Sequence, residues 1–216
     1  MFPAGVEQSF RAFQRTFHAP VWLQSVPGHF FKLSIFREVE MICYDQEMRP
    51  EELLEAAKLI CMAARTAPKG RGLDFLKTAI LTGEDKARLA ARMRDIAQRD
   101  NLAFFERDAA NVEQAGVLLL FGTKAQPMGL NGCGFCGRAS CGDLATDGGL
   151  CAFNSGDLGI AVGSAASRAA DLRIDNRILY SAGKAALELA IMGEEVRMIL
   201  GMPLSVSGKS PFFDRC

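Results

Sequence analysis

Hydrophobic residues recur at helical spacing in several stretches of the chain. The first stretch follows Pro50 and two glutamates, which suit the first turn of a helix, and its apolar residues fall on one face: Leu53, Ala57, Ile60, Cys61 and Ala64. A helix is therefore expected from Pro50 to about Arg65. Similar spacing predicts helices after Gly83, over 102–110, from a cap at Ser155, and from Ser181, the last with Ala185, Leu189 and Met192 facing inward.

Three short apolar runs between these helices are typical of buried strands. They span 76–81, 117–121, where Gly122 is expected to end the strand, and 196–200, before Pro203. Strands and helices thus alternate along most of the chain.

The helix expected after Ser155 has an unusually small contact face. Gly159, Gly163 and several alanines lie among its apolar positions, so another helix could approach it closely. Two explanations remain open: a helix at a dimer interface, or ordinary packing inside one chain.

The first forty residues differ in composition from the rest. Residues 1–40 hold seven of the fifteen phenylalanines, Trp22, His18 and His29, but none of the seven cysteines. Prolines interrupt any long helix there, and the aromatic residues follow no steady period. We expect an N-terminal appendage, either a mis-called start before Met41 or a segment that packs its aromatics on the core, followed by one domain over 41–216.

Charge and hydropathy exclude several classes of partner. The 216 residues include 25 basic and 25 acidic side chains, scattered along the chain, which gives no basic surface for nucleic acid. The longest apolar runs are far shorter than the ~20 residues that span a bilayer. Seven cysteines without a signal peptide favour a reducing cytoplasm, so a cytoplasmic protein without a membrane segment is expected.

Four cysteines form the most informative chemical pattern. Cys133, Cys136, Cys141 and Cys151 are spaced C-x2-C-x4-C-x9-C among glycines, and glycine permits the close turns that wrap a loop around a metal centre. Four thiolates without histidine suit an iron–sulfur cluster or a tetrahedral zinc ion. Zinc sites usually pair two C-x2-C units, so the spacing favours a cluster; zinc, or free redox-active thiols, are the alternatives.

The motif Cys133-Gly134-Phe135-Cys136-Gly137, followed by Cys141 and a more distant cysteine, resembles the small [4Fe-4S] domain of ferredoxin oxidoreductase subunits and corrinoid iron–sulfur proteins. A wider region, about 41–216, is similar to uncharacterised prokaryotic ferredoxin domain-containing proteins, which are related to flavin-dependent nitroreductases. The stretches that carry this similarity are 64–70, 157–166, 175–178, 201–205 and 208–215.

The resemblance implies an α+β, nitroreductase-like fold. Its features would be a central, mostly antiparallel sheet flanked by helices, a homodimer, and a cysteine- and glycine-rich cluster-binding insert at about 130–152. It also implies FMN, with contacts from Arg65, Pro68, Lys69 and Gly70, from Asp157 and Gly159, and from Lys209 and Arg215 at the phosphate.

The chain departs from nitroreductases in two places. It lacks their arginine-rich opening segment near 41–48, and Pro68 is followed by Lys69 and Gly70 without a nearby asparagine or glutamine. Lys69 could stabilise a reduced, anionic flavin or be a surface lysine. Lys209 and Arg215 could likewise be solvated charges, and Asp157 and Gly159 could serve packing alone.

Two functions from different classes follow. The first is an FMN-dependent oxidoreductase in which a [4Fe-4S] cluster passes electrons to a flavin or another acceptor, with a redox partner protein or a small molecule at the other end. The second is a non-enzymatic electron carrier or redox sensor on the same scaffold, and a structural zinc site is the third alternative. A hydrolase is disfavoured because no histidine follows Met41, and the 207–210 stretch lacks the glycine that a phosphate loop requires.

Overall fold

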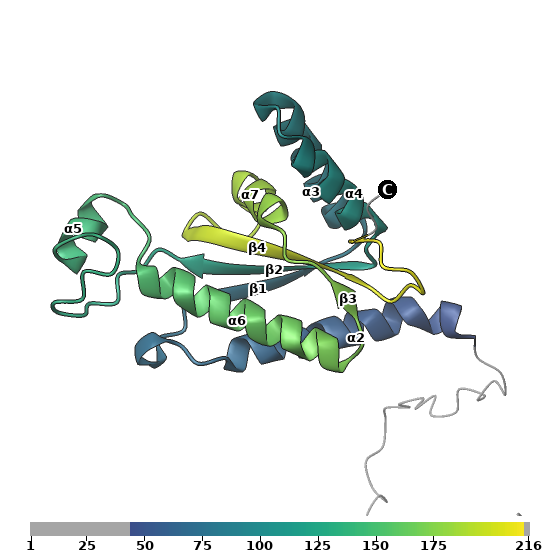
Figure 1. Cartoon of the computed structure of the whole chain (residues 1–216), viewed down its shortest axis with the longest axis horizontal. Helices are drawn as coiled ribbons and strands as arrows, with labels where there is room; N and C mark the ends of the chain where they lie inside the picture. Colours follow the sequence, from purple (N-terminus) through teal and green to yellow (C-terminus); the bar gives the residue numbers. More distant parts are fainter. Residues whose placement is uncertain (1–43, 214–216) are drawn as a thin grey trace, which may run out of the picture. The chain divides into compact units, whose positions relative to one another are not determined.

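The computed structural model describes residues 44–213, which form an α+β fold (Figure 1). In chain order the elements are α2 (Asp45–Thr66), η1 (Gly70–Gly72), β1 (Leu76–Leu81), α3 (Gly83–Asp100), α4 (Ala103–Gln114), β2 (Val117–Lys124), α5 (Cys141–Thr146), α6 (Ala152–Asp171), β3 (Asp175–Asn176), α7 (Tyr180–Glu188) and β4 (Val196–Ser205). The predictions for residues 1–40 and for Arg215 lie outside the described residues.

The sheet has the order β1-β2-β4-β3, and all its pairings are antiparallel. Helices α2 and α6 cover one face, and α3, α4 and α7 cover the other (Figure 1). Successive residues of β2 alternate between the two cores: Leu118 and Leu120 pack with α3, α4 and α7, whereas Leu119 and Phe121 pack with α2 and α6. A strand buried on both faces explains why its sequence is an unbroken apolar run.

The strand β1 begins and ends where the sequence predicts, but β2 and β4 run further. Gly122 does not end β2, which continues to Lys124. A Cβ at Gly122 would lie 2.8 Å from Val196 Cγ1, so this glycine allows close packing inside the sheet. Strand β4 continues through Pro203. The nitrogen of Pro203 lies on the same edge of β4 as the nitrogen of Gly201, and the short β3 on that edge pairs with Leu204 and Ser205 and does not extend to Pro203. The sheet therefore needs no N–H donor at Pro203.

Three predicted helix starts were wrong. Helix α2 begins at Asp45, so Pro50 lies inside it and not at its first turn. Helix α6 begins at Ala152 with Cys151 as its N-cap, and Ser155 Oγ donates to Ala152 O inside the first turn. Helix α7 begins at Tyr180, one residue before Ser181.

Ser181 is buried and donates its hydroxyl to Asp108 Oδ2 at 2.6 Å, which links α7 to α4. Its hydroxyl therefore serves tertiary packing and not a helix cap. Of the three residues expected to face inward from this helix, Ala185 is fully buried, whereas Leu189 is the C-cap and the buried Met192 lies beyond the helix.

No helix in the described part of the chain, 44–213, is long and apolar enough to cross a membrane.

Candidate functional site

The four cysteines line one cavity at the end of the sheet. They lie on the segment 125–151 between β2 and α6, here called the cysteine loop, which projects beyond the sheet and contains α5 (Figure 1). The cavity, here called the cysteine cavity, measures about 20 Å³, and Cys133, Cys136, Cys141 and Cys151 all contribute to its wall. The structure thus brings together the full set that the sequence singled out.

Glycines and a capping box shape the cysteine loop. Gly132, Gly134 and Gly137 have φ angles of 69°, 63° and 76°, in a region of backbone conformation that residues other than glycine rarely adopt. Helix α5 begins at Cys141, and Ser140 and Asp143 satisfy its first turn reciprocally: Asp143 N donates to Ser140 Oγ at 3.1 Å, and Ser140 N donates to Asp143 Oδ2 at 3.0 Å.

The fourth cysteine is placed by the long helix α6. Cys151 is its N-cap and is only 6% exposed, packed with Met128 and Leu144. The N-terminus of a 20-residue helix carries partial positive charge, which stabilises a thiolate or an anionic cluster next to it. Arg138 also lines the cysteine cavity and is paired with Asp147 at 2.6 Å.

The donor set fits an iron–sulfur cluster. Four cysteines line one cavity whose remaining walls are mainly apolar, and no carboxylate among the described residues lines it. Within residues 44–213, no three His, Cys, Asp or Glu side chains are positioned to hold a single metal ion. In a [4Fe-4S] cluster each cysteine binds a different iron, so a cluster does not require three of these side chains at one ion.

A second, larger cavity lies next to the cysteines. This open cavity measures about 490 Å³, and its wall combines the loop after α2, the start of α6 and the cysteine loop: Pro68, Lys69, Gly70, Phe135, Ala152, Phe153, Gly156, Asp157 and Ile160. Phe135, Ala152 and Phe153 line both cavities. The two cavities therefore share a wall.

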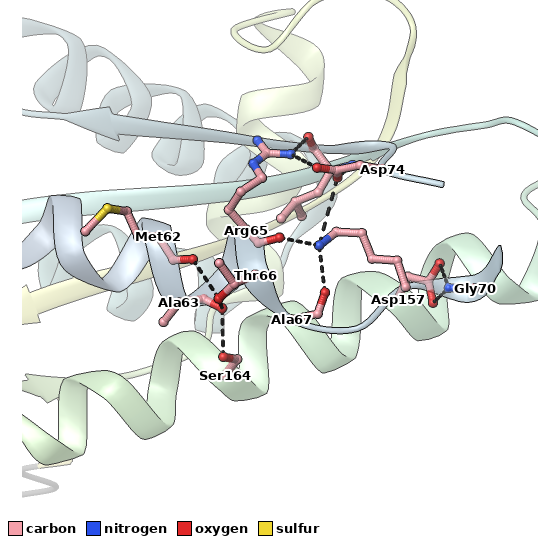
Figure 2. Close-up of polar contacts among 11 residues, drawn as sticks. Met62, Ala63, Arg65, Thr66, Ala67, Gly70, Asp74, Asp157 and Ser164 are labelled. Atoms are coloured by element: carbon pink, nitrogen blue, oxygen red, sulfur yellow. Dashed lines mark hydrogen bonds and ion pairs between the residues drawn. The ribbon is translucent and has the colours of Figure 1, made fainter. Parts of the chain in front are cut away.

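Hydrogen bonds hold the loop after α2 against α6. The N–H of Gly70 donates to both carboxylate oxygens of Asp157, at 3.0 and 3.1 Å (Figure 2). Lys69 Nζ donates to Arg65 O at 2.6 Å and to Ala67 O at 2.8 Å, so it binds the last carbonyls of α2. Arg65 turns the other way and donates to Asp74 Oδ2 and to Leu76 O, both at 2.7 Å.

The structure brings together four of the eight residues that the resemblance assigns to flavin. Pro68, Lys69, Gly70 and Asp157 line the open cavity. Arg65, Gly159 and Lys209 do not line it, and Arg215 lies outside the described residues. The wall also contains residues that were not predicted from the sequence: Phe135, Phe153 and Ile160. The place of Phe135 between Cys133 and Cys136 is a signal in the sequence that points to its role.

Cys61 is a different kind of cysteine. It lies on α2, partly buried against the core between α2 and α6, and burial raises the pKa of its thiol to about 11 despite a hydrogen bond with Thr78 and the nearby charge of Arg65. A thiol with this pKa is protonated and unreactive at neutral pH. The position of Cys61 on the apolar face of the predicted helix agrees with this placement.

Comparisons with known proteins cover both the sequence and the fold. A family model described as an uncharacterised protein containing a ferredoxin domain matches residues 147–215, a range that includes Cys151 and begins after the other three cysteines of the motif. An uncharacterised protein of Archaeoglobus fulgidus is 38% identical over 184 residues, which cover 81% of this chain and 98% of that protein.

Among solved structures, an iodotyrosine deiodinase bound to FMN and 3-iodo-L-tyrosine matches with a TM-score of 0.51 and 14% identity, covering 76% of this chain and 84% of that one. A nitroreductase with bound FMN from Desulfitobacterium hafniense matches with a TM-score of 0.47 and 15% identity, covering 78% and 81%. Nitroreductase A from Vibrio parahaemolyticus also matches with a TM-score of 0.47 and 15% identity, and the match covers 75% of this chain and 61% of that one.

At these identities the structural likeness establishes the fold, which is nitroreductase-like, and not the activity. The archaeal relative aligns over nearly its whole length at an identity that establishes common descent. The chain therefore belongs to the family of uncharacterised proteins that contain a ferredoxin domain, and it carries that domain on a nitroreductase-like fold.

Proposed function

We propose that the protein is an iron–sulfur redox protein of the cytoplasm: a homodimeric oxidoreductase that holds a [4Fe-4S] cluster on Cys133, Cys136, Cys141 and Cys151 and binds FMN in the open cavity. The observation that carries this proposal is the shared wall. Because Phe135, Ala152 and Phe153 line both cavities, a cluster and a planar cofactor would lie on either side of a single layer of side chains.

The chain's own residues have separate tasks in this proposal. The cysteines and the N-terminus of α6 hold an anionic cluster. Pro68–Gly70 and Asp157 form one side of the open cavity, and the two phenylalanine rings form the side that it shares with the cysteine cavity. A cluster supplies electrons singly and a flavin collects two, so together they suit the two-electron reduction of an organic acceptor.

The proposed homodimer rests on the outer face of α6. Gly156, Gly159 and Gly163 are exposed along one stripe with open space beside them, and Ile160 within the stripe is 50% exposed. Gly156 and Ile160 also line the open cavity, so a second copy packed on this stripe would cover its mouth. A second copy could then supply the basic residues for the FMN phosphate, Lys209 and Arg215 among them.

One observation favours the alternative of an electron carrier or sensor without flavin. Lys69 is the one cation among the described residues that line the open cavity, and its ammonium is bound to the carbonyls at the end of α2. The described residues of a single chain, 44–213, therefore place no free positive charge in this cavity for a phosphate, and we expect a protein that lacked a second copy to bind FMN poorly.

The test is metal and flavin analysis of protein purified without oxygen and reconstituted with iron and sulfide. We expect iron and acid-labile sulfide in equal amounts, a thiolate-to-iron absorption band, and bound flavin. Cys136→Ala should abolish the band, whereas the matched control Cys61→Ala should keep it, since Cys61 lies outside the cysteine loop. Iron without flavin would support the carrier; zinc without iron would overturn the redox function.

A further inference from the structure

The wall between the two cavities consists mainly of two stacked phenylalanine rings. The ring centroids of Phe135 and Phe153 are 5.7 Å apart, and the ring planes differ by 12°. Phe135 is on the cysteine loop and Phe153 is in the first turn of α6, so the stack joins the two segments that carry the cysteines. Stacked aromatic pairs of this kind are worth about 0.5–1.5 kcal/mol beyond the area they bury.

Each ring is covalently close to a cysteine of the motif. Phe135 directly precedes Cys136, and Phe153 follows Cys151 by two residues. One cluster bound to both Cys136 and Cys151 would therefore hold the two rings at a fixed distance from each other. This would preorganise the wall that the open cavity presents to a planar ring.

The open cavity has the chemistry to bind a planar heteroaromatic ring with N–H donors. Its aromatic wall offers ring faces, and Phe135 is 76% exposed. The Asp157 carboxylate accepts only the Gly70 N–H among the hydrogen bonds found in the described residues, and a carboxylate can accept about four. The isoalloxazine ring of a flavin, which is planar and carries an imide N–H, has this chemistry.

We propose that Phe135 and Phe153 are positioning residues that couple the two sites, so that a filled cysteine site raises the affinity of the open cavity for a planar ring. The coupling rests on the function proposed above. It is reciprocal, because a ligand that binds better when the cluster is present must also stabilise the cluster by the same factor.

The coupling is measured as the ratio of two FMN dissociation constants. The first is that of protein whose cysteines are reduced and which holds no metal, and the second is that of the same protein reconstituted with iron and sulfide. Equilibrium dialysis in the absence of oxygen gives both values without any assay of activity. In the wild type we expect FMN to bind about five- to tenfold more tightly to the reconstituted protein. We also expect FMN to slow the loss of iron to a chelator.

Two variants and a control assign the coupling to the wall. Phe135→Ala should reduce the ratio to about one, and Phe135→Tyr, which keeps the ring, should retain it. Because Phe135 is highly exposed, its truncation leaves the folded core intact. The control Phe104→Ala removes a partly exposed phenylalanine that also packs on another ring, but on α4 and on the opposite face of the sheet, and should leave the ratio unchanged.

The outcomes separate this inference from the proposed function. If the cluster and FMN both bind but the wild-type ratio is one, the coupling is overturned and the proposed function stands. A ratio that persists in Phe135→Ala overturns the role of the wall. If FMN binds in neither state, or if no cluster forms, the proposed function fails together with the coupling.

Discussion

At the scale of single residues, Lys69 shows how a side chain can line a cavity and yet direct its charge elsewhere. Its side chain is only 7% exposed, and its ammonium binds the carbonyls of Arg65 and Ala67, 4.0 Å from Asp74 Oδ1. The interpretation as a surface lysine was therefore wrong. The position of Lys69 fixes the end of α2 and, with it, the loop 68–70 that borders the open cavity.

We expect Lys69→Met to lower the free energy of unfolding by about 1–2 kcal/mol, since the helix end loses its charged hydrogen-bond donor. The matched control is Lys58→Met on the same helix, where the exposed lysine pairs with the exposed Glu55, and a change within about 0.5 kcal/mol is expected. Urea denaturation monitored by circular dichroism measures both. Equal effects of the two variants would contradict the assigned role of Lys69.

At the scale of elements, α7 lies against β4 because a glycine permits it. A Cβ at Gly183 would overlap the backbone carbonyl of Ile199, and Leu179 at the start of the helix exchanges hydrogen bonds with Gly201 of the strand, at 2.8 and 2.9 Å. Backbone atoms cannot move aside as side chains do, so the helix and the strand depend on this glycine for their distance.

Gly183→Ala is therefore expected to destabilise the protein by at least about 3 kcal/mol, or to prevent folding. Gly163→Ala is the matched control, because it also replaces a helical glycine but has open space around it within one chain. At a concentration where the protein is monomeric, so that the proposed dimer contact at Gly163 is absent, alanine should stabilise the chain by up to about 1 kcal/mol. Thermal unfolding of the two variants decides. A folded Gly183→Ala with wild-type stability would disprove the close packing.

A carboxylate joins α7 to α3. Glu188 accepts hydrogen bonds from Arg99 at 3.0 Å and from Arg92 at 2.7 Å, and lies 3.3 Å from Lys184. The hydrogen bonds from Arg99, followed by those from Lys184 and Arg92, lower the pKa of Glu188 to about 2, against the opposing effect of burial. A depressed carboxyl pKa stabilises the fold above the unfolded-state pKa, and this contribution is lost as the pH falls toward the folded-state value.

Glu188→Gln should therefore lower the free energy of unfolding by about 1–2 kcal/mol at pH 7, a range kept modest because Arg99 and Lys184 are partly exposed. The difference from the wild type should shrink as the pH falls from about 5 toward about 2. Urea denaturation at pH 7 and at pH 3–4 measures this. As control, Glu55→Gln on the exposed Lys58 pair should show little difference at either pH, and a pH-independent loss for Glu188→Gln would refute the linkage.

At the scale of the whole molecule, the two layers of helices differ in the kind of residues that they expose to solvent. Helix α6 exposes its three glycines and Ile160, whereas α3 on the other face carries an exposed side covered by arginines and acids. The open cavity lies at one end of the α6 stripe. The proposed homodimer and the proposed cofactor site would therefore use one continuous surface.

We expect Gly159→Leu to convert a wild-type dimer into a monomer and to weaken FMN binding, because a leucine side chain would hold a second copy away from α6. Ala91→Leu is the matched control: it places the same side chain on the exposed side of α3 and should remain a dimer. Sedimentation equilibrium measures the association state. A monomeric wild type would overturn the homodimer without bearing on the cluster.

The elements could be predicted where a local pattern determines them. The strand β1 and the presence of every long helix follow from apolar spacing, because burial of one face needs only that period. Boundary predictions were wrong where tertiary contacts outweigh local signals. Helix α7 begins at Tyr180 and not at Ser181, whose hydroxyl donates to Asp108. Strand β2 continues through Gly122 because this residue pairs with Lys77 on one neighbouring strand and with Ile199 on the other.

The sequence by itself determined the order of helices and strands and the set of four cysteines, since the spacing of apolar residues and of thiols is local information. The fold class followed from the resemblance of the sequence to a known family. Only the tertiary structure decided that the loop at Gly70 meets Asp157, eighty-seven positions away, and that the cysteines share an aromatic wall with a larger cavity. The physical reason is that such contacts depend on how α2 and α6 pack side by side on the sheet, and no period or spacing along the chain encodes that arrangement.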